Sequence, residues 1–150
     1  MLENPIRQIR RASREARLRE WKTRKDVTFL GHVNNIRELW SRAHIAILPS
    51  RREGLPLSLL EAAACGRAII ATNVPGCREV ARQGVNALVV PPEDPLALAD
   101  AIQVLAANSE LRRRLGHAGR QIVEAEFSSE RIGSEIVALY RKLLRHDRNS

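Results

Sequence analysis

The chain has 150 residues, a net charge of +8 and a pI of about 10.9, and 44% of its residues are hydrophobic. This size and balance predict a globular domain with its own core, and exclude a disordered chain. No apolar run reaches the ~18 residues of a membrane span, and the first residues do not resemble a signal peptide. Two cysteines, Cys65 and Cys77, exclude a disulfide framework, so a cytoplasmic location is expected.

The excess of positive charge gathers in residues 7–25 and 131–148. Aromatic residues make up only 3% of the chain, which is too few for a surface that stacks single-stranded bases. We therefore expect no nucleic-acid partner. Two interpretations stay open: the charges cover solvated helix faces, or they draw the protein toward phosphates or the anionic surface of an inner membrane, as a peripheral contact.

Hydrophobic periodicity predicts helices that alternate with short apolar strands. In the first half it predicts a basic helix over residues 5–24 and a strand over 27–30. A helix capped by Asn34 or Asn35 and a strand over 45–48 follow. After a loop at 49–53 comes a helix over 56–65, with Pro56 in its first turn and Gly66 just past its end.

The second half continues the alternation. Strands are expected over residues 68–71 and 87–90, with a loop at 72–76 and a short helix at 78–82 between them. A helix opening at Asp94 should bury Leu96, Ala99, Ile102 and Leu105, and two more helices should start at Ser109 and Ser128. The expected organisation is a basic N-terminal helix (residues 1–25), a Rossmann-like domain (26–127), and a C-terminal helix with a basic tail (128–150).

Strands that are apolar on both faces and alternate with helices predict an α/β fold with a doubly wound parallel sheet. Right-handed crossovers make all strands point the same way. The segments 31–32, 49–53, 72–76 and 91 all follow strands, so they should lie along one edge of the sheet. Open α/β sheets bind their ligands at this edge.

The helix over residues 56–65 would begin at this edge. Its first amides are free and carry partial positive charge, which suits a diphosphate. Gly54 would let the backbone approach a ligand closely. Leu57 and Ser58 stand at the amide-donor positions, and the Ser58 hydroxyl adds a donor.

Two glutamates accompany this helix. Glu61 has apolar neighbours on both sides, and a glutamate is seldom buried without a partner. Its carboxylate could accept two hydrogen bonds from a vicinal diol such as ribose, each contributing about 1.5–3 kcal/mol. Alternatively, Glu61 forms a salt bridge with Arg67 or Arg78. Glu53 would lie on the phosphate side, or be a solvated loop charge.

These residues form part of a longer ordered pattern. It comprises residues 48–56 (LPSRREGLP), 61–66 (EAAACG), 69–72 (IIAT), 74–79 (VPGCRE) and 84–94 (GVNALVVPPED). The pattern resembles that of the retaining nucleotide-sugar glycosyltransferases of the GT-B fold, known as glycosyl transferases group 1. The resemblance covers roughly residues 26–125 and implies the incomplete, donor-binding C-terminal half of such an enzyme.

The resemblance also implies roles for individual residues. Glu53 would be the catalytic-site glutamate that contacts the donor sugar near the reacting phosphate, and Glu61 would hold the ribose. The diphosphate would lie against the stretch Gly54, Leu55, Pro56, Leu57 and Ser58, and the base against Gly31, His32 and Val33. Such enzymes retain the anomeric configuration and usually need no metal ion, so no cofactor is expected.

The implied function is transfer of a hexosyl or N-acetylhexosaminyl group from a nucleotide-sugar to a saccharide or lipid-linked acceptor, as in bacterial polysaccharide biosynthesis. The family's acceptor domain and the βαβ unit that brings an Arg/Lys pair to the diphosphate have no counterpart in this sequence. A missing N-terminal domain or a partner chain would supply them, and Arg51 and Arg52 would either be plain surface residues or replace the lost cations. Alternatives are a non-catalytic nucleotide(-sugar)-binding module and a sugar-nucleotide epimerase.

Overall fold

The computed structural model describes residues 15–146, and its internal contacts divide the chain into two units, residues 1–34 and 35–150. In the N-terminal unit, residues 15–23 are helical. The Arg24 guanidinium then binds both carboxylate oxygens of Asp26 at 3.0 and 2.7 Å. Expected apolar positions before residue 15 of this helix lie outside the described residues.

The strand expected over residues 27–30 does not form, and this prediction was wrong. A strand needs a neighbour to accept and donate its backbone hydrogen bonds. No other described residues of the N-terminal unit form one, and Phe29 and Leu30 are 46% and 54% exposed. Apolar composition alone was therefore insufficient to predict a strand at residues 27–30. The described sheet has three strands instead of the four that were expected.

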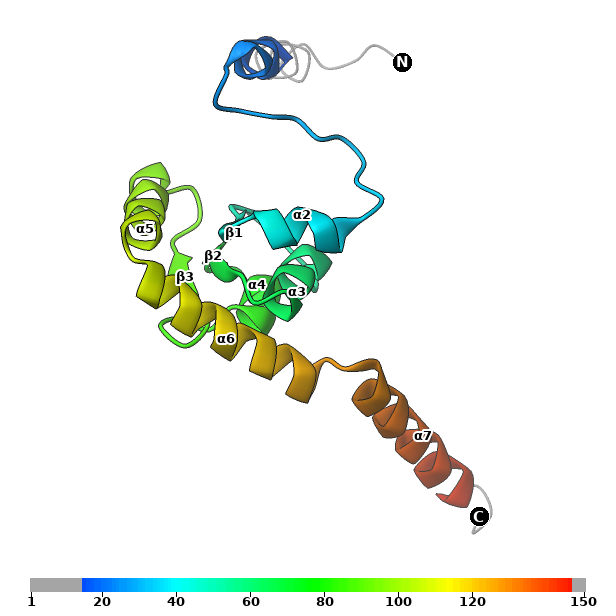
Figure 1. Ribbon diagram of the computed structural model, residues 1–150. Coiled ribbons are helices and arrows are strands. Elements are labelled where there is room, and N and C mark those ends of the chain that lie inside the picture. The colour runs from blue at the N-terminus through cyan, green and yellow to red at the C-terminus, as the bar shows by residue number, and fades with distance from the viewer. Residues whose placement is uncertain (1–14, 147–150) are drawn as a thin grey trace, which may run out of the picture. The chain divides into compact units, whose positions relative to one another are not determined.

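The C-terminal unit is built on a parallel sheet of β1 (Ile45–Leu48), β2 (Ala68–Thr72) and β3 (Ala87–Val90), in the order β1-β2-β3 (Figure 1). Ile45 lies opposite Ala68, and Ile69 lies opposite Ala87. The helices are α2 (Ile36–Arg42), α3 (Leu57–Ala64), α4 (Pro75–Val80), α5 (Pro95–Ala107), α6 (Ser109–Glu126) and α7 (Ser129–His146).

Helices cover both faces of this sheet, as the apolar strands predicted. All five residues of β2 are buried. Ile69 and Ala71 belong to the core that includes residues of α3 and α4, whereas Ile70 and Ala68 belong to the core that includes residues of α5 and the first half of α6. The α/β doubly wound class is therefore confirmed.

The start of α2 and the end of α3 follow their sequence signals, whereas Pro56, expected in the first turn of α3, is its N-cap. The Asn35 side chain accepts the Glu38 amide at 3.1 Å and caps α2. After α3, Gly66 has a φ of 68°, which a side chain disfavours. Its amide bonds to the Ala63 carbonyl, and the next amide bonds to the Ala62 carbonyl, at 2.8 and 2.9 Å. This pair of bonds is a Schellman motif.

Two helix predictions need correction. The short helix expected over 78–82 runs instead over Pro75–Val80, because proline favours the first helical position. In α5, Leu96 is 76% exposed and Ala99 is also exposed, although both were expected inside. The face of α5 toward the sheet carries Leu105 and Ala101, both buried, one turn apart.

Helix α6 crosses the end of α3 at a contact between two glycines. A Cβ built on Gly116 would lie 2.1 Å from the carbonyl oxygen of Gly66. No side chain can occupy that space without moving backbone. The contact lets α6 lie directly on the turn between α3 and β2.

A second junction ties α6 to the loop after α4. The buried Asn86 side chain accepts the Arg82 amide at 2.7 Å and donates to the Val80 carbonyl at 2.8 Å. The Arg82 guanidinium reaches across to both carboxylate oxygens of Glu126. Its hydrogen bonds and positive charge hold the pKa of Glu126 below the ordinary value, against a smaller opposing effect of burial.

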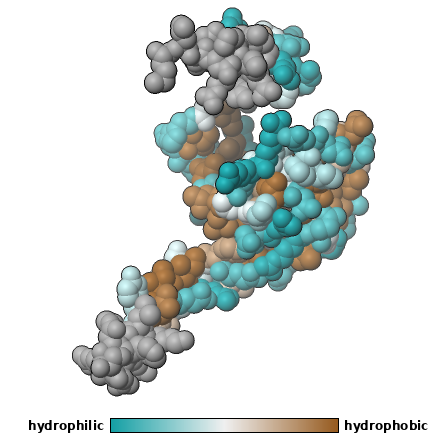
Figure 2. Space-filling model, turned by 180° about the vertical axis from the view of Figure 1, so that it is seen from behind, coloured by the Kyte–Doolittle hydropathy of each residue, from teal (hydrophilic) through white to brown (hydrophobic). Residues whose placement is uncertain are grey.

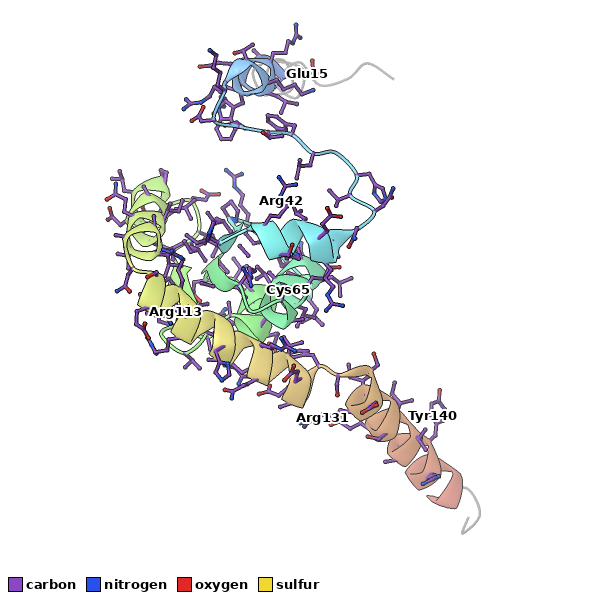
Figure 3. The ribbon with its side chains drawn as sticks, viewed as in Figure 1. Glu15, Arg42, Cys65, Arg113, Arg131 and Tyr140 are labelled. Atoms are coloured by element: carbon purple, nitrogen blue, oxygen red, sulfur yellow. The ribbon has the colours of Figure 1, made fainter. Side chains whose placement is uncertain are left out.

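Helix α7 has an exposed apolar side (Figure 2), and it carries the labelled side chain of Tyr140 (Figure 3). Its described large hydrophobic residues are 44–63% exposed: Ile132, Ile136, Val137, Leu139 and Tyr140. None of the helices in residues 15–146 combines the length and apolar character required to cross a bilayer.

We predict that Gly116→Ala destabilises the protein by about 1–3 kcal/mol, because the new methyl group forces two backbones apart. Urea unfolding measures the change. Gly133→Ala in α7 is the matched control: a Cβ there meets nothing within 4 Å, so alanine should be neutral or should stabilise by about 0.5–1 kcal/mol. Equal unfolding midpoints for the two variants would contradict the glycine contact.

Because the pKa of Glu126 is lower in the folded than in the unfolded chain, its pairing with Arg82 stabilises the protein above the unfolded-state pKa. That contribution is lost as the pH falls through the folded-state pKa. Glu126→Gln should therefore lower the unfolding free energy at neutral pH and leave it nearly unchanged in strong acid. Urea unfolding across this pH range tests it. Glu130→Gln, at an exposed position on α7 without a described ion pair, serves as the control.

Candidate functional site

The loops at the carboxyl ends of the three strands join into one rim. The Thr72 hydroxyl donates to the Ser50 carbonyl, which ties the β2 end to the loop after β1. The Asn73 amide donates to the carbonyl of Val90, the last residue of β3, at 2.7 Å. The expectation that segments 49–53, 72–76 and 91 share an edge is confirmed, whereas segment 31–32 follows no strand and its part of the prediction was wrong.

The first turn of α3 lies on this rim with open amides. The amides of Leu59 and Leu60 donate to the Pro56 carbonyl at 3.1 and 3.3 Å. The amides of Leu57 and Ser58 donate to no described residue, and both residues are exposed. Two unpaired donors at a helix N-terminus form the chemical basis of an anion site.

The segment before α3 is held in place by α4. A Cβ built on Gly76 would lie 1.7 Å from the Gly54 carbonyl oxygen and 2.5 Å from that of Glu53. In contrast, a Cβ on Gly54 would meet nothing within 4 Å. The close backbone approach within the protein therefore occurs at Gly76, which the sequence analysis missed, and Gly54 faces open space.

The Glu53 carboxylate is half-buried and accepts a hydrogen bond from the Ser50 hydroxyl at 2.5 Å.

Cys77 is buried among the core residues of α4. Burial raises the pKa of its thiol, and the negative charge of Glu53 raises it further, while a hydrogen bond with Thr72 opposes the shift. Cys77 is thus a neutral packing residue, as expected.

Glu61 is exposed, which corrects its interpretation as a buried carboxylate. It lies four residues beyond Leu57, or about 6 Å along the helix axis. It forms no ion pair with a described residue; the alternative of a salt bridge to Arg67 or Arg78 is wrong. The Arg67 guanidinium instead donates to the carbonyls of Cys65 and Ala43, at 2.9 and 3.0 Å.

The side chain of Glu61 lines a pocket of about 460 Å³ between α2, α3 and α6. Arg37, Arg67 and Arg120 also line it, so the pocket carries more positive than negative charge. The indole N–H of Trp40, another lining residue, is buried and has no acceptor among the described residues. The pocket therefore holds an acceptor in Glu61 and an unused donor in Trp40.

The sequence-derived site residues are only partly brought together. The structure gathers Glu53 and residues 54–58 at the rim and places Glu61 in the pocket one helical turn along α3. Glu53 does not line that pocket. Gly31, with a φ of 64°, and its neighbours His32 and Val33 belong to the N-terminal unit, and their role in contacting a base remains a prediction.

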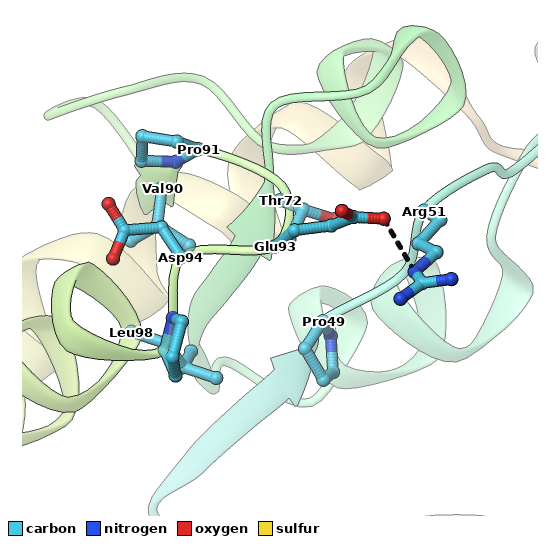
Figure 4. Close-up of a pocket in the computed structure, with 9 residues that line it drawn as sticks. Pro49, Arg51, Thr72, Val90, Pro91, Glu93, Asp94 and Leu98 are labelled. Carbon is cyan, nitrogen blue, oxygen red and sulfur yellow. Dashed lines mark ion pairs between the residues drawn. The ribbon is translucent and has the colours of Figure 1, made fainter.

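A second pocket of about 410 Å³ lies on the rim between the loops after β1 and β3 (Figure 4). Arg51 and Glu93 point toward each other there, with 2.8 Å between Nε and Oε1. The sequence does not predict this pocket, because the two residues are 42 positions apart and neither belongs to a regular element. Its lining residues are Pro49, Arg51, Thr72, Val90, Pro91, Glu93, Asp94, Pro95 and Leu98.

The fold and rim define an α/β domain of the type that binds ligands beyond the carboxyl ends of its strands. Residues 7–108 match the family model of glycosyl transferases group 1. The chain therefore belongs to this family, which confirms the resemblance inferred from its motifs.

Curated relatives support the assignment. Over 123 residues the chain is 37% identical to N-acetyl-alpha-D-glucosaminyl L-malate synthase of Bacillus anthracis, covering 82% of this chain and 32% of that protein. It is 31% identical over 120 residues to the capsular polysaccharide biosynthesis glycosyltransferase CapM of Staphylococcus aureus, covering 80% and 32%. The chain thus spans about one third of the length of these relatives.

Solved structures agree on the fold. The sucrose-phosphate synthase of Thermosynechococcus elongatus superposes with a TM-score of 0.83 at 34% identity, over 92% of this chain and 35% of that one. Anabaena HepE in complex with UDP and glucose gives a TM-score of 0.80 at 19% identity, over 92% and 38%. The chain corresponds to one part of a GT-B glycosyltransferase.

We predict that Gly76→Ala displaces the Glu53–Gly54 segment and destabilises the protein by about 1–3 kcal/mol, since its methyl group would overlap a backbone carbonyl. Gly54→Ala, with open space around its Cβ, should change stability by no more than about 0.5 kcal/mol. Urea unfolding of both variants, with amide NMR shifts over residues 50–58, checks the pair. A Gly76→Ala protein as stable as wild type would show that α4 does not hold this segment.

Proposed function

We propose that this chain is the donor-binding part of a retaining glycosyltransferase, which transfers a hexosyl or N-acetylhexosaminyl group from a nucleotide-sugar to a saccharide or lipid-linked acceptor. The observation that carries the proposal is the pairing of open amides at the α3 N-terminus with an unpaired Glu61 one turn along the same helix. Because the chain belongs to the glycosyltransferase family, we interpret these groups as a site for a nucleotide-sugar.

The diphosphate is assigned to the start of α3. The Leu57 and Ser58 amides supply donors, the helix dipole supplies partial positive charge, and the Ser58 hydroxyl adds a further donor. The open side of Gly54 leaves room for phosphate oxygens next to the backbone. Positioned donors of this type stabilise the charge that develops on the departing phosphate, so the proposal requires no metal ion.

The ribose is assigned to Glu61. Its carboxylate forms no ion pair with a described residue and lines a pocket large enough for a nucleoside. The buried N–H of Trp40 would gain an acceptor if a hydroxyl or base oxygen entered the pocket. Residues 31–33 are proposed to contact the base through their backbone.

The donor sugar is assigned to Glu53. Ser50 anchors one carboxylate oxygen and leaves the other available for sugar hydroxyls or for charge in the transition state. A ligand that runs from Glu61 past the helix start to Glu53 is elongated, as a nucleotide-sugar is. Because Anabaena HepE crystallises in complex with UDP and glucose, these two molecules are reasonable first probes.

A second candidate is a module that binds the nucleotide-sugar without turnover. It is favoured by the fact that the chain spans about one third of its curated relatives. Product formation from a panel of nucleotide-sugars and acceptors would exclude this candidate, and binding without product would support it.

We predict that the chain binds UDP, GDP or ADP and that Glu61→Ala weakens this binding by more than about 1.5 kcal/mol, because a charged hydrogen-bond acceptor is lost. Calorimetry on wild type and variant measures the difference. Glu130→Ala on α7 controls for the loss of a carboxylate elsewhere. Equal affinities for wild type and Glu61→Ala would contradict the ribose assignment, and no binding of any of the three nucleotides would contradict the proposed function.

A further inference from the structure

The pocket between the loops after β1 and β3 is separate from the residues assigned to the nucleotide. Neither Glu53, nor Glu61, nor the first turn of α3 lines it. Its volume of about 410 Å³ falls in the range of small-molecule sites, roughly 300–1,000 Å³. It opens on the same rim, because both loops follow parallel strands.

The charges of this pocket favour a neutral ligand. Arg51 contributes one positive charge, and Glu93 and Asp94 contribute two negative charges. The Asp94 carboxylate is already used in part, since one oxygen accepts the amides of Leu96 and Ala97 at the start of α5. A phosphate would face two carboxylates, and a simple cation would face a guanidinium, so neither fits the whole pocket.

The Arg51–Glu93 pair suits hydroxyl groups. Only the Nε of Arg51 and one oxygen of Glu93 are used in the 2.8 Å contact, so the terminal guanidinium nitrogens and the second oxygen are available. The two side chains are 82% and 63% exposed, so these atoms are open to a ligand. A hydroxyl both donates and accepts, and neighbouring hydroxyls can therefore bind the carboxylate and the guanidinium together.

The backbone at Glu93 has an uncommon conformation. Its φ of 61° is in the left-handed region, which non-glycine residues seldom adopt. Strained positions of this kind often occur at ligand sites. Around the pair, the pocket is lined by apolar side chains suited to the C–H face of a sugar ring: Pro49, Val90, Pro91, Pro95 and Leu98.

We propose that this pocket binds a neutral hexosyl unit, with Arg51 and Glu93 as its specificity-determining polar residues. The inference deepens the proposed function and rests on it for the source of the sugar. That source is either the glycosyl group of the nucleotide-sugar or the saccharide acceptor, which present the same hydroxyls.

The test is an NMR titration of the isotope-labelled 150-residue chain with methyl α-D-glucopyranoside and N-acetyl-D-glucosamine. Saturable shifts are expected at the amides of Thr72, Glu93 and Leu98, with affinity in the millimolar range. Arg51→Ala and Glu93→Gln should each weaken binding about fivefold or more, the loss expected for one hydrogen bond. Glu110→Gln, which breaks a comparably exposed ion pair with Arg113 on α6, should leave binding unchanged.

Further arms identify the source of the sugar. If UDP-glucose, GDP-glucose or ADP-glucose shifts the pocket amides whereas the matching diphosphate does not, the pocket takes the donor sugar and the assignment of that sugar to Glu53 is wrong. If the free saccharide still binds with the nucleotide-sugar present, it takes the acceptor. Either result supports the inference.

Three results would overturn the inference: no saturable response to any saccharide, a response unaffected by both Arg51→Ala and Glu93→Gln, or preferential binding of inorganic pyrophosphate in this pocket. Nucleotide binding at α3 without a saccharide response in the pocket would reject this inference alone. A saccharide response without binding of UDP, GDP or ADP would reject the proposed function and leave the saccharide site standing.

Discussion

The parallel alignment of three short strands, of which the central one is buried on both faces, is the constraint on which the rest of this structure depends. Every residue of β2 is inaccessible, so the strand cannot shift register without exposing apolar side chains. Its direction then determines where each loop must emerge. The first turn of α3, the Glu53–Gly54 segment and the Arg51–Glu93 pair reach one rim because the strands that precede them run together.

At the opposite edge of the sheet, before β2 and β3, arginines have structural roles. Arg67 holds the connection between α2 and β1 in place, since its guanidinium donates to the carbonyl of Ala43. Arg82 fastens the end of α6 through Glu126. Glu61 forms no ion pair with a described residue, although arginines line its pocket. A carboxylate left unpaired in this way can accept hydrogen bonds from a neutral ligand.

The sequence predicted what local signals determine: three apolar strands, the capped start of α2, the glycine end of α3 and the family. Prediction from the sequence failed where contacts with residues far away in the chain determine the structure. Val27–Leu30 has strand composition but no strand partner among the described residues of its unit, and Leu96 lies on the outer face of α5 although its residue type favours burial. Gly76 contacts a segment more than 20 residues away, and Arg51 meets Glu93 only after folding. No short-range pattern encodes such pairs.

The backbone contact at Gly76 has a mechanical consequence. With α4 directly behind it, the Glu53–Gly54 segment cannot recede into the protein, whereas its outer side is free. The segment can therefore move outward by itself, but it can move inward only together with α4. Because the next residue, Cys77, belongs to the core, an inward displacement of this segment would also disturb the packing at the centre of the domain.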